Sequence, residues 1–274
     1  MARRRGVLVA MLLGGCGGAA PAPTAPSPVV EDPAAPAAVE APRYTLVLDD
    51  ADRDLEAALR GDVEAGIARI EEFFGAPFAR PFTVAVAADR AALDAHWGAR
   101  WHRPDLRTEC WMVGMGMGDE LSLLSPARWG DQACEHDPVD AAARASLIAH
   151  ELVHTYHAQR NPALDTDDDG EGFAALAWLV EGVATYVSSQ LDDGHLASAR
   201  QVLDAGAGPT SLAEAHAGRY RYGVSGSLVA YVDATWSRAA VVDLLAVRSP
   251  DEVLARLGVD EATLLEGWRA WVTR

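Results

Sequence analysis

The sequence contains no lysine: all 23 of its basic residues are arginine, and 40 acidic residues outnumber them, for a formal net charge of −17. A chain this acidic is poorly suited to binding nucleic acid or an anionic membrane surface through bulk electrostatics, and we expect neither. Long apolar runs are also missing, because no stretch reaches the ~20 residues that a membrane-spanning helix needs. Half of the 274 residues are nevertheless hydrophobic, which suits one sizeable domain or two small ones.

Residues 1–15 have the composition of an export signal. Arg3–Arg5 form a positive region, and Gly6–Leu13 form a short apolar stretch. Leu13-Gly14-Gly15-Cys16 resembles the lipobox of bacterial lipoproteins, in which the cysteine becomes the lipidated first residue. The resemblance implies an extracytoplasmic protein of the cell envelope, in the periplasm or at the outer membrane, that meets the membrane only through the lipid on Cys16. The alternative is an ordinary secretory signal in which Cys16 is incidental.

Residues 16–42 consist almost entirely of Ala, Pro, Gly, Thr, Ser, Val and Glu. Such a segment lacks aromatic residues and periodicity, so it cannot bury enough apolar surface to fold, and it is expected to act as a disordered tether. The folded domain is then expected over residues 43–274.

Cysteine is scarce in the folded part, where only Cys110 and Cys134 occur. An exported chain meets an oxidising compartment, which favours a disulfide between the two. The alternatives are two separate buried thiols or a pair of metal ligands, although the spacing matches no zinc knuckle.

Hydrophobic periodicity differs between the two halves of this domain. The first half is predicted to alternate strands with two helices: strands at Tyr44–Leu48, Phe82–Ala87, Trp111–Met117 and Leu121–Leu124, and helices at Asp50–Phe74 and Arg90–Trp97. We therefore expect an α+β fold, with a strand-rich N-terminal half packed on a helical C-terminal half that carries the functional site.

The helical half is expected to begin at Asp137-Pro138, where Asp137 can cap a helix and proline suits its first position. This helix should run to about Arg160 and stop at Asn161-Pro162. A second helix is expected over Phe173–Gln190. The capping-box spacing of Ser211–Glu214 and of Ser249–Glu252 predicts the starts of later helices.

The sequence His150-Glu151-Leu152-Val153-His154 is the strongest chemical signal in the chain. A helix places residues four apart on one face, so the two histidines can hold one metal ion while Glu151 reaches a water bound to it. A catalytic zinc ion needs a third protein ligand. Glu181, on the next predicted helix and flanked by small residues, is favoured over His157, which lies on nearly the same face but one turn further away.

This motif, taken with Trp178–Tyr186, resembles the gluzincin metallopeptidases. Over roughly residues 44–248 the layout is similar to the peptidase MA-like family, which is related to the aminopeptidase branch. The resemblance implies one zinc ion held by His150, His154 and Glu181, with Glu151 as the general base. Metzincins are excluded, since they require glycine and histidine at positions where this chain has His157 and Arg160.

A further segment, Tyr222–Tyr231, resembles the part of these families that carries a tyrosine near the zinc ion. The phenol of Tyr222 could donate a hydrogen bond to a developing oxyanion. Tyr220 competes for this role, and a tyrosine that only packs under a helix is the structural alternative.

Three details limit or extend the resemblance. Thermolysin-like enzymes have an aspartate four residues after the ligand glutamate, where this chain has Thr185. Gly116–Glu120 matches the amine-binding motif of the aminopeptidases only loosely, so the sequence gives no support to aminopeptidase specificity. Asp165–Gly170 has the alternating carboxylates of a Ca²⁺ loop, but Leu176 replaces the final glutamate, which favours an acidic surface loop.

The expected function is therefore zinc-dependent hydrolysis of a peptide or protein substrate by a lipid-anchored metallopeptidase. The competing hypothesis is a non-catalytic binding or envelope-assembly protein that keeps the fold as a scaffold. The presence of Glu151 favours the enzyme, because a purely structural metal site has no use for that carboxylate.

Overall fold

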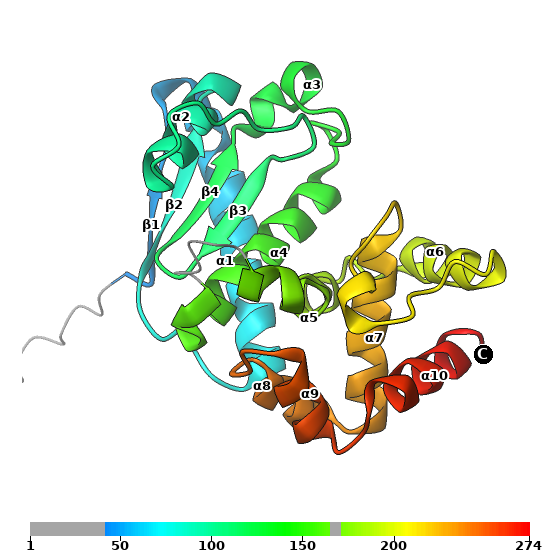
Figure 1. Ribbon diagram of the computed structural model, residues 1–274. Coiled ribbons are helices and arrows are strands. Elements are labelled where there is room, and N and C mark those ends of the chain that lie inside the picture. Colours follow the sequence, from blue (N-terminus) through cyan, green and yellow to red (C-terminus); the bar gives the residue numbers. More distant parts are fainter. Residues whose placement is uncertain (1–41, 165–170) are drawn as a thin grey trace, which may run out of the picture. The chain divides into compact units, whose positions relative to one another are not determined.

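Ten α-helices and one four-stranded sheet make up the described part of the chain, residues 42–164 and 171–274, in the computed structural model (Figure 1). The mixed α+β class expected from the sequence is confirmed. Residues 42–274 cluster into one unit. The expected export signal, Cys16 and the tether up to residue 41 lie outside the described residues, as does the acidic segment Asp165–Gly170.

The sheet has the strand order β1-β2-β4-β3. The strands β1 (Tyr44–Val47), β2 (Phe82–Ala87) and β4 (Glu120–Leu124) run parallel, and β3 (Gly114–Met117) lies antiparallel to β4 at the edge. In β2, alternate residues are buried, as expected for a strand whose side chains point to opposite faces. Edge strand β3 lines the cleft of the candidate site.

Helices cover both faces of this sheet. On one face lie α1 (Glu56–Phe74) and α4 (Ala141–Arg160), which pack against each other, with α4 also against β3. On the other face, α2 (Arg90–Arg100) packs over β2 and β4 and helps to bury Trp97 and Trp129 in a smaller core. The result is a helix–sheet–helix arrangement in which α4 links the sheet to the helices that follow.

The remaining helices surround α7 (Arg221–Thr235). It packs against α5 (Glu171–Val187), α6 (Asp193–Asp204), α8 (Arg238–Leu244) and α10 (Glu261–Val272), and α9 (Pro250–Leu257) packs against α8 (Figure 1). Because α5 contacts both α4 and α7, it is the element through which the two helical layers meet. None of the described helices is long and apolar enough to cross a membrane.

The first half is less rich in strand than the sequence predicted. Helix α1 alone has 19 residues, as many as the four strands together. The predicted strand at Trp111–Met117 is shorter, since only Gly114–Met117 pairs with β4. The residues before it instead belong to a loop fixed by side-chain contacts, which strand propensity does not report.

Two predicted helix starts were wrong. Helix α4 begins at Ala141 and is capped by Asp140, whose carboxylate accepts a hydrogen bond from the Ala143 N–H at 2.9 Å. Asp137 closes a short turn instead, with its carboxylate on the Val139 N–H. Ser211 precedes only the 3₁₀ turn Leu212–Glu214 and makes no side-chain cap. The stop of α4 before Asn161 and the cap of α9 by Ser249 are confirmed.

The loop before β3 is held by a disulfide and by one arginine. Cys110 and Cys134 are joined, with their Cα atoms 5.3 Å apart. The guanidinium of Arg90 donates hydrogen bonds to the carbonyl oxygens of Glu109 and Cys110, each at 3.1 Å, and to that of Gln132. These contacts fix the loop that carries Trp111 beside the candidate site.

The other short elements are α3 (Trp129–Gln132) and the 3₁₀ turns Asp50–Leu55, Pro126–Arg128 and Pro162–Leu164.

Candidate metal centre

Helix α4 presents two imidazoles side by side. His150 and His154 are four residues apart, so one turn of the helix stacks their side chains on the same face. Their ring centroids are 4.8 Å apart and their Nε2 atoms 3.1 Å apart. Both side chains are mostly buried, which keeps the pair in one arrangement.

Glu181 reaches this pair from α5. Its Oε2 atom lies 3.3 Å from His150 Nε2 and 3.6 Å from His154 Nε2. The neighbouring Gly182 explains how α5 fits here, because a Cβ atom at this position would lie 2.5 Å from the backbone oxygen of Ser225 on α7. The small residue beside Glu181 thus permits close contact between α5 and α7.

The three side chains form a group that could hold a metal ion, since all their ligand atoms lie within 4.8 Å of one another. Tetrahedral ligands at ~2.0–2.1 Å from a zinc ion are about 3.3–3.4 Å apart, close to the three separations found here. Two imidazoles and one carboxylate also suit zinc chemically. His150, His154 and Glu181 therefore fit a metal ion in number, type and spacing.

The charges within this group depend strongly on one another. Burial lowers the pKa of His154, but the adjacent Glu181 carboxylate more than offsets this and leaves that pKa above its usual value. For Glu181 burial acts to raise the pKa, yet the two imidazoles hold it well below its usual range. The carboxylate therefore stays ionised, as a metal ligand must be.

Glu151 lies on α4 next to the group and is held by the sheet. Its Oε2 atom accepts a hydrogen bond from the backbone N–H of Gly116 at 2.9 Å. A Cβ atom on Gly116 would lie only 1.8 Å from the backbone oxygen of Glu151, so β3 and α4 can approach this closely only with glycine there. The sequence offered Gly116 only as a loose motif match, whereas the structure makes it the contact that positions Glu151.

Tyr222, at the start of α7, faces the group from the other side. Its ring centroid is 6.1 Å from that of His150, and burial raises its pKa to about 12. Tyr220 directly precedes the start of α7, where it makes no side-chain cap; it packs beside Arg219 and does not line the cleft. Of the two tyrosines, the structure thus places Tyr222 near the metal group.

His216 was not singled out in the sequence, yet it lines the same cleft. Its Nδ1 atom lies 3.0 Å from the Ser225 hydroxyl, which itself donates to the Ala215 carbonyl at 3.2 Å. A hydroxyl that donates there must accept from His216, so Nδ1 carries the proton. The ring packs against Tyr222 at 5.3 Å between centroids. No local motif marks this residue, because the contact joins a loop to a helix.

His157 does not join the metal group. Its Nε2 atom donates to the backbone oxygen of Leu245 at 3.0 Å, and the side chain is almost fully buried. Burial, with a smaller effect from His154, lowers its pKa to about 4. The third position near the two histidines is occupied by Glu181.

A cleft of about 1210 Å³ opens in front of the metal group. Its walls come from the disulfide-bonded loop and β3 on one side and from α5 to α7 on the other; Trp101, Trp111 and Met115 add apolar surface, and Arg221 adds a cation. The volume exceeds the roughly 300–1,000 Å³ of typical small-ligand pockets, so the cleft has room for several residues of an extended chain.

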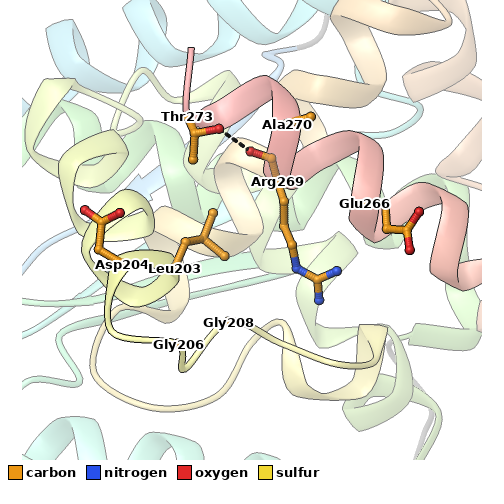
Figure 2. Close-up of a pocket in the computed structure, with 8 residues that line it drawn as sticks. All are labelled: Leu203, Asp204, Gly206, Gly208, Glu266, Arg269, Ala270 and Thr273. Atoms are coloured by element: carbon orange, nitrogen blue, oxygen red, sulfur yellow. Dashed lines mark hydrogen bonds between the residues drawn. The ribbon is translucent and has the colours of Figure 1, made fainter.

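A second hollow lies between α6 and α10, among residues that are not part of the metal group (Figure 2). Asp204 and Glu266 stand at opposite ends of it, so the two carboxylates do not converge on a ligand. Arg269 already donates to the backbone oxygen of Pro209. The side chains of this hollow offer no ligand set comparable to that of the cleft.

No protein-family model, curated protein or solved structure matches this chain. The function is therefore inferred from the residues and their geometry.

Proposed function

We propose that this protein is a zinc-dependent metallopeptidase that hydrolyses peptide bonds at the His150/His154/Glu181 group. The observation that carries the proposal is the position of Glu151, a carboxylate outside the ligand group that is held beside it by the Gly116 N–H. A metal site with only a structural role needs no such carboxylate. A zinc ion bound there would supply Lewis acidity, which polarises a carbonyl group and lowers the pKa of a water molecule.

Glu151 is the proposed general base. Its carboxylate takes a proton from the attacking water, holds it, and passes it to the nitrogen of the leaving amine. The hydrogen bond from Gly116 fixes the carboxylate while its second oxygen is left for this transfer. Proton removal from the water and proton delivery to the leaving amine then both depend on Glu151, whose position is set by β3.

Tyr222 is the proposed donor to the oxyanion. With a pKa of about 12, its phenol keeps its proton at neutral pH and can donate a hydrogen bond to developing negative charge. His216 supports this side of the cleft by packing against the phenol ring.

Edge strand β3 supports a peptide as the substrate. Among the described residues it pairs with β4 alone, so an extended chain could add along its other side as a further strand, except at the Gly116 N–H, which donates to Glu151. The cleft beside β3 is large enough for such a chain. Location in the cell envelope through a lipid on Cys16 is part of the same proposal and rests on residues 1–16 of the sequence.

The test compares the wild type with Glu151→Gln, which removes the base but keeps size and metal ligands. We expect zinc content near one ion per chain in both, and hydrolysis of a mixed peptide library lower in the variant by ~10²–10⁴-fold or more. Zinc is measured by mass spectrometry and cleavage by sequencing the products.

Glu181→Ala serves as the matched control for the metal, and it should lose tight zinc binding. Full zinc occupancy in that variant would show that the third ligand is wrong. Absence of hydrolysis by the zinc-loaded wild type, over a broad library and native envelope proteins, would favour the scaffold hypothesis instead.

A further inference from the structure

Arg221 is the one arginine among the described residues that line the cleft. The same lining contains five carboxylates: Glu135, Asp140, Glu151, Glu181 and Asp192. In a chain of net charge −17, an arginine in the cleft beside the metal group calls for an explanation. No described carboxylate lies within 4.0 Å of its guanidinium, so an internal ion pair does not supply that reason.

Two aromatic rings on opposite walls of the cleft hold this side chain. The guanidinium carbon lies 5.3 Å from the ring centroid of Trp111, on the disulfide-bonded loop, and 5.1 Å from that of Tyr222, on α7. Packing against aromatic rings engages the flat face of a guanidinium and leaves its in-plane N–H donors available. Arg221 is therefore a fixed, half-buried cation. It also makes a side-chain hydrogen bond with Tyr222, and because a guanidinium has five N–H donors, others remain for a ligand.

The structure also indicates how far Arg221 lies from the metal group. Tyr222 links it to the metal group, because the Tyr222 ring is 6.1 Å from the ring of His150 and 5.1 Å from the guanidinium. An extended chain advances ~3.3–3.6 Å per residue. A group bound to Arg221 would therefore lie within about three residues of a bond positioned at the metal group.

We propose that Arg221 binds a carboxylate of the substrate and so makes the cleft selective for peptides that carry one near the cleaved bond. A planar guanidinium matches a carboxylate through two parallel N–H···O bonds, and the partly buried setting strengthens them. The carboxylate belongs either to the C-terminus of the peptide or to an Asp or Glu side chain. This specificity rests on the proposed peptidase function, but the binding step can be measured without turnover.

The experiment uses the full-length, zinc-loaded Glu151→Gln protein in detergent, with paired libraries of hexapeptides. One pair differs only in a free or amidated C-terminus, and the other only in Glu/Asp or Gln/Asn within the peptide. Dissociation constants are measured by affinity selection and calorimetry. We expect the carboxylate member of at least one pair to bind about 10- to 100-fold more tightly, as for charge-assisted hydrogen bonds. The pair that discriminates identifies the source of the carboxylate.

Adding Arg221→Gln should remove this discrimination and leave the affinity for the uncharged members nearly unchanged, while Arg221→Lys should retain part of it. Arg219→Gln is the matched control, because Arg219 packs beside Tyr220 and does not line the cleft. Thermal stability and zinc content show that each variant is folded.

Equal binding of the paired peptides by the parent protein would overturn the proposal. The proposal would also be overturned if Arg221→Gln weakened the binding of charged and uncharged peptides alike. The arginine would then only hold together the two walls of the cleft that carry Trp111 and Tyr222. Hydrolysis is tested separately with Glu151 intact, so selective binding without cleavage would contradict the peptidase function and leave the carboxylate site in place.

Discussion

Three histidines on α4 have different chemistry although they lie within eight residues of one another. His150 and His154 share the carboxylate of Glu181, which raises the pKa of His154 against the effect of burial. His157 faces away from that carboxylate and donates to a backbone oxygen. It has no anion to compensate for lost hydration, so its pKa falls to about 4. Side-chain direction, and not residue type, decides which histidines belong to the candidate metal group.

The low pKa of His157 predicts a pH-dependent stability. The unfolded chain takes up a proton near pH 6.5 and the folded one only near pH 4, so the unfolded state binds more protons between these values. The contribution of His157 to the free energy of unfolding is therefore fully present above pH 6.5. It is lost as the pH drops toward 4, by about 2–3 kcal/mol at the lower end.

Urea denaturation of metal-free protein at pH 7.5 and pH 4.5 measures this effect. His157→Gln can still donate to the Leu245 oxygen but does not titrate, so the wild type should lose about 2–3 kcal/mol more than the variant between the two pH values. The same loss in both proteins would contradict the assignment.

At the scale of elements, the contact between α5 and α7 sets the position of Glu181, the proposed third ligand. Gly182 follows Glu181 directly, and a Cβ atom there would lie 2.5 Å from Ser225 O and 2.8 Å from Ser225 C. Both are backbone atoms of α7, which cannot rotate away as a side chain can. The approach of the two helices thus controls where the Glu181 carboxylate lies.

Gly182→Ala should therefore destabilise the fold by ~1–3 kcal/mol, as expected for overpacking, and weaken metal binding by displacing Glu181. Gly61→Ala is the control, because Gly61 is also helical but has nothing within 4 Å of its would-be Cβ atom. That change should stabilise α1 by ~0.5–1 kcal/mol. Thermal unfolding and zinc titration of both variants provide the measurement, and equal effects would show that the close contact carries no cost.

At the scale of the whole molecule, net charge and helix hydropathy bear on how the protein could reach a membrane. The charge of −17 opposes adsorption to anionic lipids, and none of the described helices can span a bilayer. Lipidation of Cys16 is then the proposed route, with residues 17–42 as the spacer.

Metabolic labelling with a fatty-acid analogue should tag the wild type and fail to tag Cys16→Ser, which should appear in the soluble fraction. Lipid attached to one cysteine would account for both results. Equal labelling of the two proteins would exclude Cys16 as the lipidation site.

The sequence by itself determined the features that depend on neighbours along the chain. The spacing of His150 and His154 places both on one helical face whatever surrounds the helix. Alternation in Phe82–Ala87 and the stop at Asn161-Pro162 are equally local, and the structure has both where the sequence predicted them. Glu181 could be favoured as a partner from its position and flanks, but its meeting with the histidines required two helices to pack.

Only the tertiary structure decided the contacts between distant segments. Gly116 holds Glu151 across 35 residues, His216 takes its tautomer from Ser225, and Arg221 meets Trp111 from another wall of the cleft. None of these pairs has a fixed spacing or a local propensity, because each depends on how closely whole elements approach. The prediction of strand at Trp111–Val113 was wrong for the same reason. The disulfide and Arg90 hold that loop, and these long-range contacts outweigh the strand propensity of a short segment.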